Sequence, residues 1–388
     1  MTLAADQFMQ SSIKAPLSRA TGGLAMSVER ISGEAWDEAV ADFDGVCQEQ
    51  LYVFARMRWP SVEHEALLFR VDGEVVGGVL VMIQPLPLRV GAIAVTKWGP
   101  LLKDESRPDS DAIYAAMIET LITDYAQKRR LMLSVLPRAS LTEVNGEAEY
   151  LWKRGFRKGS ALLFPNRYIV NLRLSDEEQR KSFHQKWRYH LNKADKEGLV
   201  FERAPVSRLP EFDALYSAMT DRKKFPDHSA YDTVPGLMAI ADERLRPELF
   251  FVRQGEEIVS GAVIFKSGDR AVYLYGATND RALPLRAGYF LHWHIIRWLR
   301  DNTRASWYDL GGTDGFQGLH QFKKGMVGDK GVITPVPHVA NYAASALPMM
   351  LGLGAFAARD SVQHIKRVID GLRSDKAKPD QARNEDAA

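Results

Sequence analysis

Two segments of this chain occur twice in the same order, and this internal repeat limits the folds that it can adopt. Each member of the first pair is typical of two strands joined by a tight Gly turn: Leu68–Val79 and Phe251–Ala262. The second pair consists of basic-aromatic segments ending in Gly and an apolar residue: Trp152–Phe156 and Phe322–Met326. The ordered pair predicts a duplicated unit of about 150–170 residues.

The pattern around each copy predicts a mixed α/β domain, with an antiparallel hairpin followed by a strand, a helix and a further strand. We therefore expect two tandem α/β domains, and 388 residues suffice for two cores. Ala161–Asn171 is expected to be the closing strand of the first domain. The expected limits are a disordered N-terminus at 1–24, domains at 25–172 and 173–338, and a tail at 339–388.

Composition narrows the class of protein. The net charge of +2 excludes a strongly basic nucleic-acid coat protein, although a local basic patch remains compatible with it. Cys47, the single cysteine, fits a reducing compartment and is expected to be buried. The first 23 residues lack the pattern of a signal peptide, so we expect a cytoplasmic protein. We also expect it to be a monomer.

The tail begins with twenty residues without a charge, Val339–Ala358. Its Ala and Gly content and its Asn341, Ser345 and Pro348 make it too polar for a typical membrane span. We expect a packed or membrane-surface helix here, with peripheral contact at the inner face of the membrane through 339–373. Ser374–Ala388 is expected to be disordered.

Between the expected domains, Phe183, Trp187, Leu191 and Ala194 form an apolar stripe at helical spacing. Lys and Arg cover much of the remaining surface, so this amphipathic helix either joins the domains as a solvated element or contacts phosphates. The candidate phosphate contacts are Arg188, Lys193, Lys196 and, from the second copy, Lys324.

The stretch Trp307–Gly312 reads as a strand that ends in a Gly pair, and it is followed by a predicted helix start near His320–Met326. Glycines let the main chain turn sharply and let a ligand approach it. A helix start there would direct free N–H groups at that ligand. No HExxH motif or Cys pair is present, so we expect no metal site, and the sequence also has no P-loop and no GxSxG elbow.

These segments resemble the "YDFGG … FKKGFGG" signature of the Fem family (FemABX), and Tyr273–Ala277 resembles its "YLYGA" strand. Trp187–Gly198 resembles its "RNIRKAxKxG" segment, and Lys97–Pro100 resembles its "RGP" turn. The resemblance covers roughly Val28–Pro335. It implies a doubled GNAT-like (N-acetyltransferase-like) fold and an aminoacyltransferase that builds peptidoglycan cross-bridges. The chain departs from the signature at Met326–Asp329.

The resemblance also implies roles for individual residues. The Phe322 main chain and Lys323 would stabilise the oxyanion of acyl transfer, although Lys323 also fits a surface lysine near a helix start. The expected substrate contacts are Tyr273, Tyr275, Arg222, Tyr231, Arg58 and Asp309. Tyr273 and Tyr275 alternate with Leu274, so both are expected on one side of their strand, in a cleft or in the core. For Asp309, capping of the next loop is the alternative.

Three functions are consistent with these residues. The first is transfer of an amino acid from aminoacyl-tRNA to an amine of a nucleotide- or lipid-linked peptidoglycan precursor. The second is an acyl-CoA-dependent N-acyltransferase acting on a sugar or polysaccharide precursor, and the third is a non-catalytic binding module. The expected CoA loop, Arg281–Tyr289, contains only Gly288, which disfavours the second. No cofactor is expected beyond aminoacyl-tRNA or acyl-CoA as co-substrate.

Overall fold

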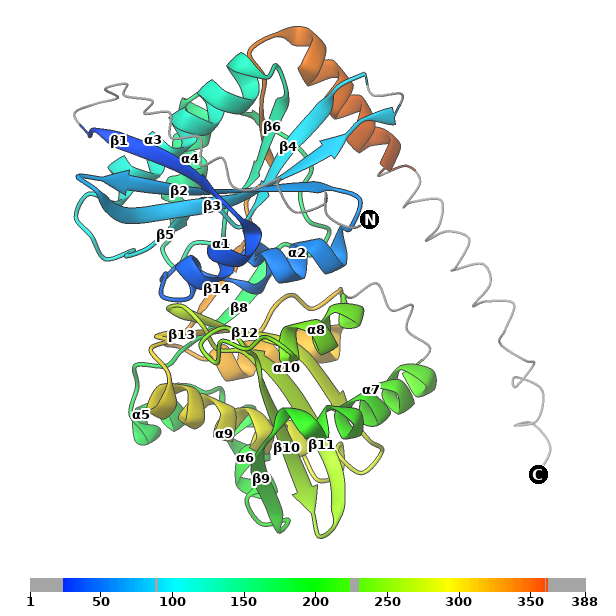
Figure 1. The fold of residues 1–388 in the computed structure, drawn as a ribbon. Coiled ribbons are helices and arrows are strands. Elements are labelled where there is room, and N and C mark those ends of the chain that lie inside the picture. Colours follow the sequence, from blue (N-terminus) through cyan, green and yellow to red (C-terminus); the bar gives the residue numbers. More distant parts are fainter. Residues whose placement is uncertain (1–23, 88–89, 224–229, 360, 362–388) are drawn as a thin grey trace, which may run out of the picture.

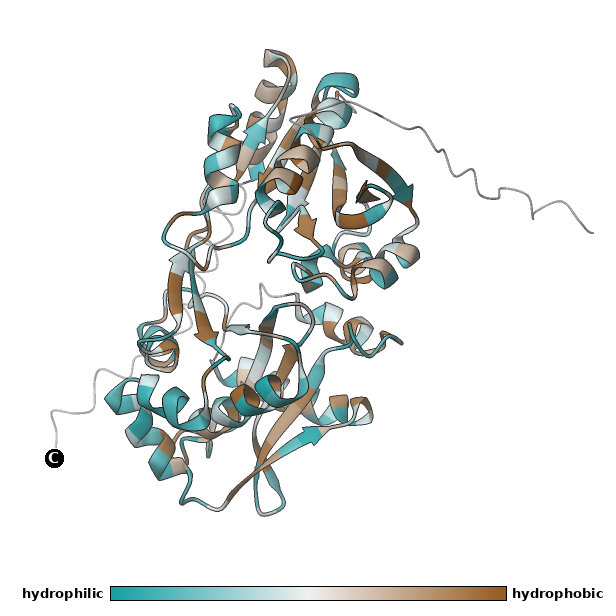
Figure 2. Ribbon diagram, turned by 90° about the vertical axis from the view of Figure 1, so that its left-hand side faces the viewer, coloured by the Kyte–Doolittle hydropathy of each residue, from teal (hydrophilic) through white to brown (hydrophobic). Residues whose placement is uncertain are grey.

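The computed structural model describes residues 24–87, 90–223, 230–359 and 361, and these form two lobes stacked on one another (Figure 1). The expected disordered segments are 1–24 and 374–388, and all of their residues except Leu24 lie outside the described part; Leu24 packs against the first core. Each lobe is built on one mixed β-sheet with helices on its faces. Figure 2 shows hydrophobic residues concentrated on the strands and hydrophilic residues on the outer sides of many helices.

The first sheet has the strand order β1-β2-β3-β4-β6-β15-β7, with β5 beside β3. Its strands are β1 (Met26–Ile31), β2 (Glu63–Val71), β3 (Glu74–Pro85), β4 (Ala92–Lys97), β5 (Leu101–Leu102), β6 (Met132–Leu136), β7 (Arg157–Lys158) and β15 (Ala340–Tyr342). The helices of this lobe are α1 (Gly33–Val40), α2 (Tyr52–Arg58), α3 (Ser110–Leu121) with a π-helical continuation over Ile122–Lys128, and α4 (Gly146–Lys153).

The second sheet has the order β14-β8-β13-β12-β11-β10-β9. Its strands are β8 (Asn166–Asn171), β9 (Leu199–Ala204), β10 (Glu248–Gln254), β11 (Glu257–Phe265), β12 (Arg270–Thr278), β13 (Trp307–Asp309) and β14 (Val332–Pro335). The helices of this lobe are α5 (Asp176–Ser182), α6 (Gln185–Ala194), α7 (Leu209–Lys223), α8 (Val234–Met238), α9 (Ala287–Asn302) and α10 (Gln317–Val327).

The two sheets correspond strand by strand. The repeated hairpins are β2–β3 and β10–β11, and both are followed by a strand that pairs in parallel with the strand after the next helix: β4 with β6, and β12 with β13. The repeated basic-aromatic segments lie at α4 and α10, which precede the edge strands β7 and β14. The predicted pair of similar mixed α/β domains is therefore confirmed.

One strand departs from the prediction. Ala161–Asn171 does not close the first sheet, because β8 pairs with β13 and β14 in the second sheet. The matching place in the first sheet, between β6 and β7, is filled by β15 from the other end of the chain. The apolar side chains of β8 explain the placement, since Tyr168 and Val170 are buried in the second core. Sequence order alone assigned this strand to the wrong sheet.

The segment between the expected domains forms two helices, α5 and α6. Ser175 and Glu178 form a capping box at the start of α5, and the chain is extended at Phe183 and His184 before α6 begins. The apolar stripe of Phe183, Trp187, Leu191 and Ala194 is buried in the second core. This segment therefore packs onto the second sheet rather than standing free between the lobes.

The two lobes share a hydrophobic cluster. Trp36 and Leu51 of the first lobe pack together with Leu237 and Phe265 of the second. Helix α2 lies directly on α8, where a side chain on Gly236 would collide with Met57. A cluster of buried residues across the junction fixes the lobes against each other.

The tail forms a helix over 346–359 that packs on the first sheet. Met349 contacts Ile93 and Met132, and Gly352 lacks the side chain that would otherwise clash with Met132. Among the described helices, none combines the length and the hydropathy that crossing a bilayer requires.

Candidate active site

The parallel strands β12 and β13 separate after three paired residues. Val272 opposite Asp309 is the last pair, after which β12 continues to Thr278 while β13 ends. Beyond this point the sheet is open between the two strands, and side chains from α9 and α10 fill the opening. We call this place the strand opening.

The turn after β13 is held by Asp309. One carboxylate oxygen of Asp309 accepts the Gly311 N–H at 2.9 Å, and Gly311 has a φ of 75°, which favours glycine. Arg167 of β8 donates its Nε to both Asp309 oxygens at 3.1 Å. Burial alone would raise the pKa of Asp309, but Arg167, Arg270 and the Gly311 N–H hold it below its ordinary value. The structure thus shows Asp309 as the cap of this loop.

Lys323 of α10 reaches into the strand opening. Its Nζ donates to the carbonyls of Leu310 at 2.6 Å and Gly312 at 2.5 Å, and it lies 5.8 Å from the centre of the Tyr273 ring. The side chain is buried, with 6% of the residue exposed. Burial, followed by the nearby Arg167, lowers the pKa of Lys323 to about 8. Two of the three ammonium donors are used by the turn, which leaves one for a ligand in the opening.

His292 of α9 completes the surroundings of Lys323, and our sequence analysis missed it. Its Nδ1 lies 3.2 Å from the Tyr308 hydroxyl, and its ring packs edge-on against Tyr273. Burial, followed by the charge of Lys323, lowers the pKa of His292 to about 3, so the imidazole is neutral at neutral pH. The available signal was a histidine among the apolar residues on the core-facing side of this helix.

Phe322 has a different role from the one predicted. Helix α10 begins at Gln317, so the Phe322 N–H lies inside the helical hydrogen-bond ladder and cannot be offered to a ligand. The Phe322 ring packs edge-on against Tyr289 and His292. Phe322 therefore packs behind Lys323 and does not bind an oxyanion. Helix α10 thus begins at Gln317, before the start that was predicted near His320.

The prediction that Tyr273 and Tyr275 share one side of β12 is wrong. A bulge at Leu274 shifts the register, because Ile264 pairs with Tyr273 and Val263 with Tyr275. Tyr273 therefore packs toward α9, whereas Tyr275 packs toward α7.

Four predicted substrate contacts lie on the α7 face of the sheet. Tyr231 packs edge-on against Tyr275 at 5.1 Å between ring centres, and its hydroxyl donates to Asp213. Arg222 donates to Asp280 and to the carbonyl of Thr278 at the end of β12. Arg58 of α2 lies 3.9 Å from Asp232, next to Tyr231. We call Tyr275, Tyr231, Arg222 and Arg58 the tyrosine-arginine group.

The predicted phosphate contacts lie on the opposite face, which carries α6, α9 and α10. Lys193, Lys196 and Lys324 are exposed there, and the Lys193 Nζ lies over the Tyr189 ring. Arg188 differs from them, because its guanidinium donates to the carbonyls of Lys181 and Phe183 at the end of α5. Arg188 thus stabilises α5, and the three lysines are the exposed members of this basic group.

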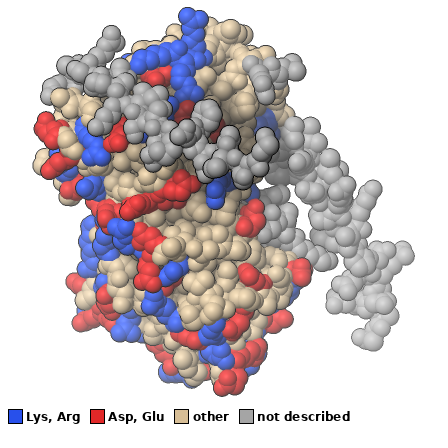
Figure 3. Space-filling model, viewed as in Figure 1, with Lys and Arg blue, Asp and Glu red and all other residues tan. Residues whose placement is uncertain are grey.

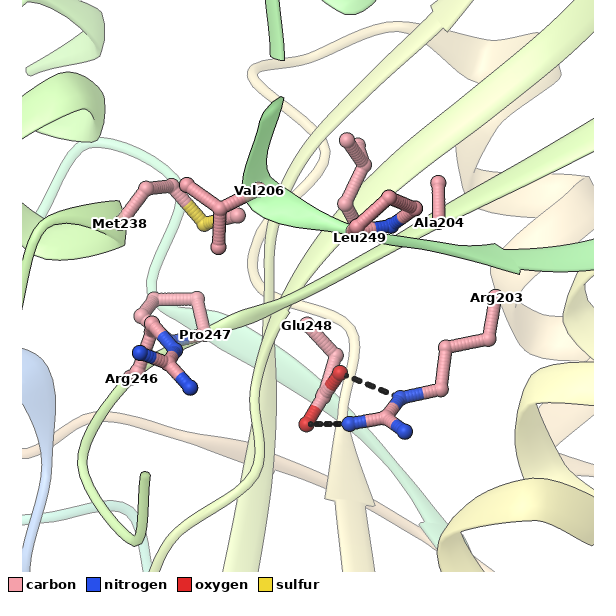
Figure 4. Close-up of a pocket in the computed structure, with 9 residues that line it drawn as sticks. Arg203, Ala204, Val206, Met238, Arg246, Pro247, Glu248 and Leu249 are labelled. Carbon is pink, nitrogen blue, oxygen red and sulfur yellow. Dashed lines mark hydrogen bonds and ion pairs between the residues drawn. The ribbon is translucent and has the colours of Figure 1, made fainter. Parts of the chain in front are cut away.

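A hollow with a volume of about 420 Å³ lies away from the strand opening, at the β9–β10 edge of the second sheet (Figure 4). Arg203 and Glu248 form an ion pair across it, and Arg246 lies on its other side. These charges are satisfied, so the hollow shows no catalytic group. Within the described residues, no cluster of three His, Cys, Asp or Glu side chains is placed to hold a metal ion.

Comparison with known proteins identifies the fold. Residues 181–324 match a family described as an acetyltransferase (GNAT) domain. A crystal structure of FemX superposes with a TM-score of 0.65 and 17% identity, covering 83% of this chain and 98% of FemX. The chain has a tandem GNAT fold. Its second domain, which carries the strand opening, contains the stretch that matches the acetyltransferase (GNAT) family.

The tandem GNAT fold also occurs in the structure of L-PGS from Bacillus licheniformis. That structure has a TM-score of 0.51 and 15% identity, and it covers 83% of this chain and 95% of its own. No curated protein matches the chain in sequence. Because both sequence identities are low, these comparisons establish the fold and not the substrates.

Proposed function

We propose that this tandem GNAT protein is an aminoacyltransferase that moves an amino acid from aminoacyl-tRNA to an amine of a peptidoglycan precursor. The observation that carries this proposal is Lys323, a buried ammonium in the strand opening with one donor left for a ligand. The likeness to FemX over nearly its whole length supports the choice of substrates.

The proposed chemistry is an acyl transfer in the strand opening. The acceptor amine attacks the ester carbonyl of the donor, a C–N bond forms, and the carbonyl oxygen becomes an oxyanion. The C–O bond to the terminal ribose then breaks, and the proton lost by the amine ends on the ribose hydroxyl. With a pKa of about 8, Lys323 is mostly protonated at neutral pH and can donate to the oxyanion. His292 is neutral, so it packs beside the ammonium without adding a second charge.

The two faces of the sheet suit different substrates. The exposed lysines Lys193, Lys196 and Lys324 suit the phosphates of a tRNA end. The tyrosine-arginine group on the other face suits an acceptor that carries anionic and polar groups. The Lys323 ammonium lies in the strand opening between the two faces, where an ester from one side would meet an amine from the other.

The test is a transfer assay with purified protein, total charged tRNA and a nucleotide-linked peptidoglycan precursor, read by mass spectrometry. We expect a precursor heavier by one amino-acid residue, dependent on charged tRNA and destroyed by prior ribonuclease treatment. A parallel reaction contains acetyl-CoA in place of tRNA, because the matched family is described as an acetyltransferase. Acylation only in the acetyl-CoA reaction would mean that the donor is an acyl-CoA and not aminoacyl-tRNA. If neither reaction gives a product, a non-catalytic binding module would be favoured.

A further inference from the structure

A narrow hollow lies at the junction of the two lobes, on the side of Asp309 that faces the first domain. It is lined by Cys47, Gln48 and Glu49, by Trp98 after β4, by Arg138 and Ala139 after β6, and by Arg167, Arg270, Val272 and Asp309 of the second sheet. Figure 3 shows charged side chains of both signs at the waist between the lobes. We call this hollow the junction pocket.

Arg270 is the unusual residue of the junction pocket. It is 7% exposed, and its side chain donates one hydrogen bond, at 2.8 Å, to the carbonyl of Ala139. Its Nε is buried without a hydrogen-bond partner. Within the described part of the chain, Arg270 also has no carboxylate at ion-pair distance. Burial, followed by the charge of Arg138, lowers the pKa of Arg270 to about 10.

The carboxylates around the pocket are already engaged. Asp309 is paired with Arg167, Glu105 with Arg138, and Glu49 with Lys97. Burial raises the pKa of Glu147, a further carboxyl near Arg138 and Arg270, to about 7. Two of the three arginines thus have a paired carboxylate, Arg270 has none, and Glu147 is only partly ionised at neutral pH, so the pocket carries an excess of positive charge.

A buried guanidinium with an unpartnered Nε and no directly paired carboxylate is unfavourable, and a hydrogen-bonding anion would relieve it. The arginine fork suits carboxylate and phosphate oxygens. The pocket also adjoins the strand opening. A side chain on Gly311 would lie 4.0 Å from an Arg167 nitrogen and 3.9 Å from the Lys323 Nζ. An anion held by Arg270 and Arg167 would therefore be anchored beside the reacting centre.

We propose that the junction pocket is an oxyanion site in which Arg270, with Arg138 and Arg167, binds a carboxylate or phosphate group of the acceptor substrate. The identity of the acceptor as the source of this group rests on the proposed function. The binding of an oxyanion by Arg270 does not, because it rests on the burial of this guanidinium and its unpartnered Nε. The site would hold the acceptor by its anionic group while its amine reaches the strand opening.

The test measures thermal unfolding of the full chain with inorganic phosphate, with acetate or with chloride at equal ionic strength, without tRNA or acyl-CoA. We expect phosphate, acetate or both to raise the melting temperature by roughly 3–5 °C over chloride at about ten times Kd. Phosphate alone identifies a phosphate site, and acetate alone identifies a carboxylate site. The shift should disappear in Arg270→Met and shrink in Arg270→Lys, which keeps the charge but loses the fork.

The matched control is Arg246→Met, which removes an arginine from the hollow of Figure 4 and should keep the full anion-dependent shift. Lys323→Met should also keep the anion-dependent shift in melting temperature. Loss of transfer can therefore be told apart from loss of anion binding. Equal shifts in wild type and Arg270→Met, or no shift with either anion, would overturn the proposal. If Arg270→Met is unfolded, the Arg270→Lys comparison alone decides it.

Discussion

Replacing Lys323 by methionine separates the charge in the strand opening from the packing around it. Methionine keeps the length of the side chain and removes the ammonium. We expect transfer to fall by about 10²–10³, or roughly 3–4 kcal/mol, which is typical for loss of one oxyanion donor. The matched control is Lys153→Met at the corresponding helix α4, where the lysine is exposed, and there we expect no loss.

The structure also predicts what happens to the stability of this variant. Two hydrogen bonds from the ammonium to the Leu310 and Gly312 carbonyls disappear, and each is worth roughly 1.5–3 kcal/mol. Against this, the variant no longer buries a charge. Lowering the pKa of Lys323 from 10.5 to about 8 corresponds to roughly 3 kcal/mol of destabilisation. The two effects largely cancel, so Lys323→Met should remain folded at neutral pH.

The pH dependence isolates the charge. The folded-state pKa of Lys323 lies below its ordinary value, so the unfolded chain binds more protons between pH 8 and 10.5. The destabilisation is complete below pH 8 and disappears as the pH rises to 10.5. Denaturant unfolding should show the wild type gaining stability relative to Lys323→Met over this window, and wild-type transfer should decline above pH 8. A folded Lys323→Met protein that transfers at the wild-type rate would refute the role of Lys323.

Three further predictions concern the surroundings of the site and the tail. Gly311→Ala forces a side chain onto a residue with a φ of 75° and should lower the free energy of unfolding by about 1–2 kcal/mol, measured in urea. Asp309→Asn removes the partner of buried Arg167 and should lower stability by about 3 kcal/mol at pH 7. The difference from wild type should shrink as acid protonates Asp309; a constant difference down to pH 2 would contradict the ion pair. Deleting 346–388 should leave a folded protein that binds less to anionic vesicles, because Leu347 and Met350 are exposed on that helix. Deleting 339–388 also removes β15 and should unfold the first domain, which circular dichroism would detect.

Most of the fold that could be predicted from the sequence was predicted from the repeated segments. The hairpins of β2–β3 and β10–β11 and the helices α4 and α10 follow from local patterns, since turn glycines and alternation are properties of neighbouring residues. The Gly pair after β13 likewise indicated a candidate site at this turn, near Asp309 and Lys323.

The remainder of the site depends on long-range contacts. Arg167 and Asp309 are 142 residues apart, and Arg270 is 131 residues from its partner Ala139, so no local pattern connects them. The opposite facing of Tyr273 and Tyr275 depends on a one-residue bulge that follows from pairing with β11. Phe322 was misassigned because the exact start of α10 decides whether its N–H is free.

The exchange of β8 and β15 sets an order in which the chain can fold during synthesis. The second sheet is drawn from one continuous stretch, Asn166–Pro335, and is complete once that stretch has left the ribosome. The first sheet is synthesised earlier, but β6 has no partner on its outer side until Ala340–Tyr342 emerges. An unpaired strand edge is a site of aggregation, so the N-terminal half depends on translation of the C-terminal half for its protection. Truncated translation products of this chain would therefore expose the β6 edge, even when they contain every other strand of the first sheet.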